Sequence, residues 1–174
     1  MKKMMRTMAS VTLSAMALIA PVQAFANNYV AGSSSNSNAI LTDDVLWTTI
    51  RTVNVTITDA GSHGCVATAS ADVSTPGPAG VENQYLFVLT RNTTAPASDT
   101  GSERQLELVD NSGVNDPNSK PVSTTLHFTG LTSTNGTAGT GLHTFRLLGK
   151  KVQAADTNAT VLDASLAVIC VPTP

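Results

Sequence analysis

The chain has 174 residues, with 10 lysines and arginines against 12 aspartates and glutamates, for a formal net charge of −2. A weakly acidic chain with scattered basic residues and only 4% aromatic residues does not suit binding to nucleic acid or to an anionic membrane surface. Thr and Val favour strands, whereas Ser, Asn and Gly favour turns, so the composition points to a β protein.

Residues 1–26 have the pattern of a secretory signal peptide. Three basic residues stand among the first six, residues 8–20 are apolar, and Ala24-Phe25-Ala26 is an A-x-A cleavage pattern. The apolar run is too short to span a bilayer. We predict cleavage after Ala26, with Ala24 as the alternative, and a mature chain starting at Asn27. The mature chain then has seven basic and twelve acidic residues, for a net charge of −5. The predicted location is extracellular or periplasmic, without a membrane span.

Residues 27–39 are polar and rich in Ser and Asn, and we predict a flexible leader. Two alternatives stay open: the segment packs as an added strand, or it reaches a neighbouring subunit. Residues 40–174 are predicted to form a single antiparallel β-sandwich of seven to eight strands, either jelly-roll or Ig-like. The strands follow from alternating apolar residues between turn signals, and we place them at 45–58, 64–73, 84–91, 104–109, 122–131, 142–152 and 159–171.

The first predicted strand, 45–58, changes phase. Its apolar residues keep one set of alternate positions up to Ile50 and the other set from Val53 onward. A shift of phase within a half-buried strand predicts a β-bulge or a break, here near Arg51. Trp47 is the only tryptophan and is predicted to anchor the core.

Two other strands carry distinct signals. Strand 84–91 is apolar on both faces and is predicted to be central in its sheet. Strand 142–152 carries Lys150 and Lys151 near its end, and we expect both to be exposed.

The two cysteines stand on the predicted core faces of their strands. The closing strand has five residues at a spacing of two, Leu162, Ala164, Leu166, Val168 and Cys170. The strand 64–73 has a similar face, Cys65, Ala67, Ala69, Ala71 and Val73. Because two cysteines in an exported protein usually pair, we predict a disulfide between Cys65 and Cys170.

The three histidines suggest no shared site. If 122–131 and 142–152 form a hairpin, His127 falls opposite Arg146 and on the other face from His143. His63 and Cys65 have a spacing that can chelate a metal, but no second pair completes four ligands. We therefore predict no metal site at the histidines.

The segment 110–121 concentrates oxygen ligands that suit Ca²⁺, notably Asp110, Asn111 and Asp116. It lacks the order of an EF-hand, and such residues are common in plain turns. We interpret it as a turn and keep calcium as a weak alternative, with no other cofactor. The chain has no G-x-S-x-G nucleophile motif, and we assign no catalytic residue.

The end of the chain resembles a known class of domains. GLHTFRLLGKK (Gly141–Lys151) followed by ATVLDASLAVICV is similar to the last two strands of C1q- and tumour-necrosis-factor-like jelly rolls, where a G-x-x-T-F-x-L strand precedes an S-L-x-V-I strand. Together with CVATASADV, YLFVLT and VSTTLHF, it also resembles small uncharacterised bacterial secreted proteins. The resemblance implies a compact jelly roll, with trimers as one form of assembly, that binds through loops or grooves. It assigns no functional residues.

From these features we expect a secreted, non-enzymatic β-sandwich that acts by binding or as a surface or matrix component. The expected partner is a protein, a glycan or a second copy of the chain, and the loops 92–102, 110–121 and 132–141 are the expected contact regions. One alternative is a subunit of an extracellular filament that uses the leader for strand donation. A second alternative is a secreted hydrolase that uses scattered carboxylates.

Overall fold

The computed structural model describes residues 28–75, 81–96, 103–109, 122–131 and 137–173. Side chains are not described for residues 35–37, 122–131 and 137. The predicted signal peptide and the calcium candidates Asp110, Asn111 and Asp116 lie outside the described residues.

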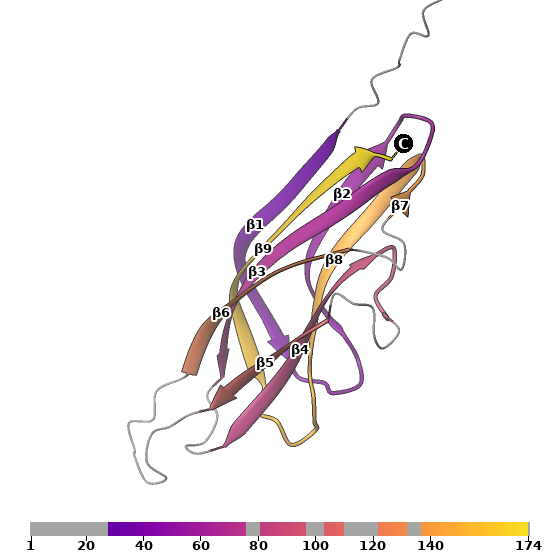
Figure 1. Ribbon diagram of the computed structural model, residues 1–174. Coiled ribbons are helices and arrows are strands. Elements are labelled where there is room, and N and C mark those ends of the chain that lie inside the picture. The colour runs from indigo at the N-terminus through magenta and orange to yellow at the C-terminus, as the bar shows by residue number, and fades with distance from the viewer. Residues whose placement is uncertain (1–27, 76–80, 97–102, 110–121, 132–136, 174) are drawn as a thin grey trace, which may run out of the picture.

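The described residues form strands and no helix, arranged as two antiparallel sheets that pack face to face (Figure 1). One sheet has the order β1-β9-β3-β6, with the short β7 also paired to β3, and the other has the order β2-β8-β4-β5. The bounds are β1 Tyr29–Leu41, β2 Thr48–Ile57, β3 His63–Thr75, β4 Glu82–Arg91, β5 Arg104–Val109, β6 Val122–Leu131, β7 Thr137–Ala138, β8 Gly141–Lys151 and β9 Ala159–Pro172. The predicted β-sandwich is therefore confirmed.

The strands pair from the ends of the chain inward. β1 pairs with β9, β2 with β8, β3 with β6, and β4 with β5. Successive strands cross from one sheet to the other except at β4–β5 and β6–β7. This nested order is that of a jelly roll, whereas an Ig-like sandwich keeps its first two strands side by side in one sheet.

The polar leader is a strand. Tyr29–Leu41 forms β1 and pairs antiparallel with β9, so the prediction of a flexible leader is wrong for these residues and the alternative of an added strand holds. Both ends of β1 are anchored. The Tyr29 hydroxyl accepts hydrogen bonds from the backbone N–H groups of Thr58 (3.0 Å) and Asp59 (3.1 Å). At the other end, the Leu41 side chain is fully buried. Sequence composition missed this strand because Ser and Asn are weak strand formers, and pairing with β9 overrides that weakness.

The core lies between the sheets and contains Tyr85, Phe87 and Phe145, all fully buried. β4 lies between β8 and β5, as predicted for its apolar residues. The predicted face of β3 is also confirmed, since its five alternate residues from Cys65 to Val73 are buried.

Two bulges set which side chains face the core. The register of β2 against β8 shifts between Thr49 and Arg51, which confirms the predicted bulge and lets Ile50 join the core. A second shift, in β9 against β3, leaves Leu162 as an extra residue between the paired Val161 and Asp163. Leu162 is therefore 49% exposed, and its predicted place on the core face is wrong. The other four predicted residues of that face are buried.

Two further expectations are wrong. β6 and β8 belong to different sheets, so they form no hairpin, and His127 lies in register with Ser70 of β3 rather than with Arg146. Lys151 is buried, because its ammonium group donates to the carbonyl oxygens of Ala154 (3.2 Å) and Asp156 (3.0 Å) in the β8–β9 turn. The stem of a lysine can lie in an apolar layer when its charged end is hydrogen-bonded.

Candidate functional site

The most distinctive surface feature is the loop of residues 42–47 between β1 and β2, which we call the apolar loop. Asp43 orders it, because its carboxylate accepts hydrogen bonds from the backbone N–H groups of Val45 (2.7 Å) and Leu46 (2.8 Å). The backbone carbonyl of Asp43 also accepts from the N–H of Lys151 (2.9 Å) on β8. The hydrogen bonds from Leu46 and Val45 lower the pKa of Asp43, because they favour its charged form. The loop thus has a defined conformation.

The ordered loop presents two large apolar side chains to solvent. Val45 is 72% exposed and Leu46 is 68% exposed. Single exposed apolar residues are common on proteins, but two adjacent ones on an ordered loop form a compact apolar tip. Because the loop is already ordered, a partner would bind it without the entropic cost of ordering it.

Trp47 adjoins this tip. It is partly exposed, so its predicted place in the core is wrong. The ammonium group of Lys150 lies 5.1 Å from the centre of a Trp47 ring, a cation–π contact, and donates to the carbonyl oxygen of Asp44 (3.0 Å). The lysine therefore connects the tryptophan to the apolar loop.

A cavity of about 300 Å³ opens beside the loop. Apolar groups of Trp47, Leu86 and Pro96 contribute to its walls, with one acid, Glu103, and one base, Lys150. Polar atoms outweigh apolar atoms in this lining, so the cavity suits a polar or charged group. The sequence does not reveal this site, because Leu46 continues the alternation of the following strand and the predicted strand begins at Val45.

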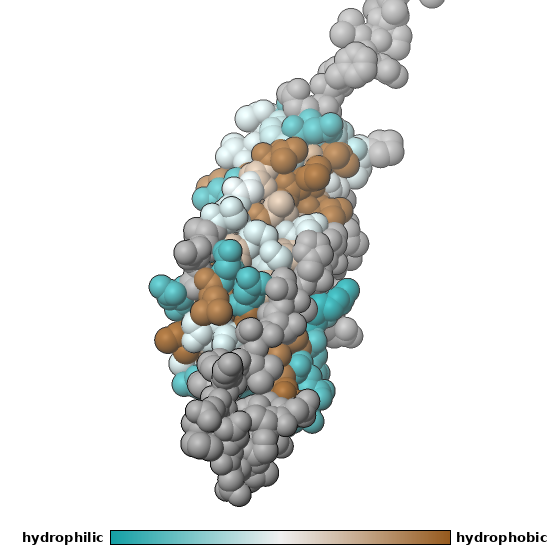
Figure 2. Space-filling view, turned by 90° about the vertical axis from the view of Figure 1, so that its left-hand side faces the viewer, coloured by the Kyte–Doolittle hydropathy of each residue, from teal (hydrophilic) through white to brown (hydrophobic). Residues whose placement is uncertain are grey.

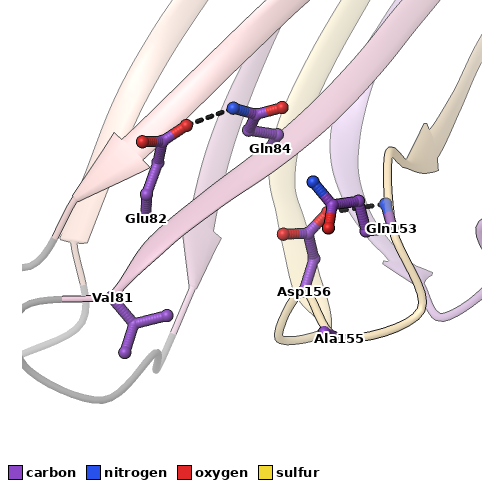
Figure 3. A pocket seen from close by; sticks show the side chains of 6 residues that line it. All are labelled: Val81, Glu82, Gln84, Gln153, Ala155 and Asp156. Carbon is purple, nitrogen blue, oxygen red and sulfur yellow. Dashed lines mark hydrogen bonds between the residues drawn. The ribbon is translucent and has the colours of Figure 1, made fainter.

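A second cavity, of about 280 Å³, is polar (Figure 3). It lies where β4 begins and where the β8–β9 turn approaches it, and its acids are Glu82 and Asp156. Asp156 is buried and accepts a hydrogen bond from the backbone N–H of Gln153 (2.8 Å), as a turn cap does. The Gln84 amide donates to Glu82 and accepts from the amide of Gln105. These polar groups stabilise the turn and the edge of the sheet.

The outer face of the β1-β9-β3-β6 sheet carries a third feature, an apolar cluster visible as the upper brown area in Figure 2. Val30 and Val66 are both in register with Ile169, on either side of it. These three residues and Val171 are 43–71% exposed. The sequence signal was the uninterrupted apolar run at residues 168–171, where both faces of the strand are apolar.

The predicted disulfide between Cys65 and Cys170 is confirmed. The two residues are directly opposite each other on the adjacent strands β3 and β9, and both side chains are fully buried. A disulfide is compatible with an extracellular or periplasmic protein.

The histidines lie apart. The ring of His63 is buried, 5.4 Å from the ring of Tyr29 in an edge-to-face arrangement. His143 contacts Asn92 and the carbonyl oxygen of Gly139. Among the described residues, no three histidine, cysteine or acidic side chains gather as a metal site would require.

No protein-family model and no curated protein matches the chain. In the described part of the chain, no helix has the length and apolar character needed to cross a membrane.

Proposed function

We propose that the protein is exported, is not an enzyme, and acts by binding another protein as a surface or matrix component. The apolar loop is the contact site in this proposal. The observation that carries it is the pair of exposed apolar side chains, Val45 and Leu46, on a loop held by the Asp43 carboxylate.

A protein partner suits this surface better than a glycan. Glycan sites commonly combine an open aromatic face with several polar groups. Here the Lys150 ammonium group lies over the Trp47 ring, so the ring does not offer an open face. The tip itself is aliphatic. Burial of apolar area is the dominant favourable term in most protein–protein association.

Export is supported by the pattern of residues 1–26 and by the buried disulfide, since such bonds persist in oxidising compartments. The location in this proposal is outside the cytoplasm, in the periplasm or beyond it.

The test is site-specific photo-crosslinking in cells that export the protein. A photoreactive amino acid at position 46 is expected to give a discrete adduct with a protein of different mass, and Val45→Ser is expected to reduce its yield several-fold. The matched control is the same amino acid at position 52, since Thr52 is an exposed residue of β2 away from the loop. The proposal fails if position 46 gives no adduct, or if position 52 gives the same adducts.

A further inference from the structure

The first strand leaves one edge without a described neighbour. Among the described strands β1 pairs only with β9, so no described strand pairs with the other side of residues 29–34. Proteins usually protect such edges with charges, prolines or short strands, because a free edge can pair with another strand. β1 is 13 residues long, YVAGSSSNSNAIL, without a charge or a proline. By contrast, β5 has six residues and carries Arg104 and Glu107, and the edge strand β2 carries Arg51 and a bulge. The register of β1 shifts only between Asn36 and Ala39, beyond the segment 29–34. The opposite edge strand, β6, has ten residues and also lacks a proline and an acidic or basic residue other than its histidine.

The free backbone groups of β1 can be identified from its neighbours. Cys65 and Cys170 are 4.1 Å apart at Cα, the short separation of a pair that exchanges no backbone hydrogen bonds. The backbone groups of Cys170 therefore face β1 and bond to Tyr29, its partner in register. Backbone groups alternate in direction along an antiparallel strand. Those of Ala31 and Ser33 accordingly face β9, and those of Val30, Gly32 and Ser34 face the free edge.

The position of Gly32 supports this assignment. A Cβ atom built on Gly32 would lie 4.0 Å from the Cβ of Ala167, which is in register with it. That distance also fits a pair without mutual backbone hydrogen bonds. The nearest atom to such a Cβ, the carbonyl oxygen of Leu166, is 3.6 Å away, an ordinary contact. A side chain at position 32 would point out of the sheet, and no described neighbour within the chain requires a glycine here.

The same strand offers both an apolar side chain and a place for it. Val30 is 71% exposed. Two residues further along, a recess of about 270 Å³ lies over β1 and β9, with Gly32, Ser34 and Ala167 in its lining. The recess exists because these residues have small side chains.

We propose that the free edge of β1 pairs antiparallel with the β1 edge of a second copy of this chain, about a two-fold axis at Gly32. This register sets Val30 opposite the second copy's Ser34, and Gly32 opposite its own equivalent. Each Val30 then covers the recess of the other copy, and the exposed backbone groups of Val30, Gly32 and Ser34 bond across the axis. The axis is perpendicular to the sheet, so the two sheets join into one with their outer faces on the same side. Self-pairing meets no like-charge repulsion, because the strand is uncharged.

The proposal concerns a different surface from the apolar loop and stands independently of it. Its test is sedimentation velocity of the purified mature protein over a range of concentrations, with Ser34→Pro as the decisive variant. Proline lacks the N–H that Ser34 directs to the free edge, so it removes two hydrogen bonds across the axis and none to β9. We expect a concentration-dependent dimer for the unmodified protein. In Ser34→Pro the dissociation constant is expected to rise about 30-fold or more, with little change in melting temperature.

The matched control is Ser33→Pro, which removes an N–H that faces β9 and is expected to lower the melting temperature. Ile169→Thr is the second control, because it changes the outer apolar cluster and leaves the edge intact. A monomer at every concentration, or a dimer unaffected by Ser34→Pro, would overturn the proposal. So would a dimer lost only in Ile169→Thr, which would place the contact on the face of the sheet. An open series of larger oligomers would overturn it too. Such a series would mean that β1 of one copy pairs with the opposite edge strand, β6, of the next, a head-to-tail contact that does not close into a dimer.

Discussion

At the scale of single residues, the buried disulfide and the buried lysine have the clearest consequences for the stability of the fold. Cys65 and Cys170 join two strands that are adjacent in space but 105 residues apart in sequence. The ammonium group of Lys151 donates hydrogen bonds to two backbone carbonyl oxygens of the β8–β9 turn beneath the surface. Each of these groups has a matched substitution that isolates its contribution to stability.

We expect Cys65→Ala with Cys170→Ala to lower the free energy of unfolding by about 4–5 kcal/mol in the chain-entropy model, because the bond closes a loop of about a hundred residues. Urea unfolding of the double variant and of the unmodified protein measures the difference. Reductant should produce a similar loss in the unmodified protein and none in the variant. Equal stability of variant and unmodified protein would show that the bond does not form.

Lys151→Met is expected to lower the free energy of unfolding by about 1–3 kcal/mol, since the carbonyl oxygens of Ala154 and Asp156 lose their donor. The neighbouring Lys150→Met is the control and should cost less than about 1 kcal/mol, because that lysine is only partly buried. Urea unfolding of both variants decides, and the reverse order would contradict the buried position of Lys151.

At the scale of elements, the loop of residues 42–47 and the strand β9 show how local order arises. The loop is ordered by one carboxylate. In β9, the bulge at Leu162 shifts the alternation of buried and exposed residues by one position, so Leu162 faces solvent. In both cases a single residue decides which side chains reach solvent.

The order of the apolar loop should depend on the charge of Asp43. Backbone hydrogen bonds from Leu46 and Val45 lower the pKa of Asp43 from its ordinary 3.8, so the loop is ordered above that pH and loses its order as the pH falls through the lowered value. Fluorescence of Trp47, the only tryptophan, should report a transition below pH 3.8. Asp43→Asn keeps the acceptor oxygen and should abolish this transition. A fluorescence change that remains in this variant at lower pH reports global unfolding. An unaltered transition in Asp43→Asn would contradict the role of the carboxylate.

The bulge in β9 predicts opposite outcomes for two leucines. Leu166→Ala should cost about 2–5 kcal/mol, since Leu166 is 1% exposed in the core. Leu162→Ala should cost less than about 1 kcal/mol, because Leu162 is half-exposed. Chemical denaturation of both variants tests the phase of the strand. Similar losses would place Leu162 in the core, where simple alternation puts it.

The strand pattern was readable from sequence because alternation of apolar residues follows directly from the period of a strand. The bounds of β5 and β6 agree with the prediction, and the phase change near Arg51 was visible as two sets of alternate positions. The bulge at Leu162 was hidden, because apolar residues fill both sets around it. The pairing of β6 with β3 was also hidden, since a hairpin between neighbouring segments is the simplest expectation and only the whole sheet excludes it.

The candidate sites were less readable. The disulfide followed from the count and positions of the cysteines. The apolar loop did not, because exposure of Val45 and Leu46 depends on hydrogen bonds to Asp43 that alternation does not encode. The resemblance of the last strands to C1q- and tumour-necrosis-factor-like domains stays a prediction.

At the scale of the whole molecule, the fold pairs the first strand of the chain with the last. β1, taken from a polar segment, lies beside β9, and β9 is bonded through Cys170 to β3. The last strand is therefore interior to its sheet, and the first strand provides an edge. The apolar loop and this edge are the two proposed contact surfaces, and they lie on different parts of the molecule.

The most direct test of this account is residue-resolved amide hydrogen exchange of residues 29–34 in the mature protein, measured by NMR at low and at high concentration. At low concentration the amides of Ala31 and Ser33, which bond to β9, should exchange slowly, and those of Gly32 and Ser34 should exchange fast. At high concentration the amides of Gly32 and Ser34 should become slow as well, because the second copy covers the edge. Fast exchange throughout the segment at both concentrations would contradict the account, since it would make these residues a flexible leader with no strand and no edge to pair.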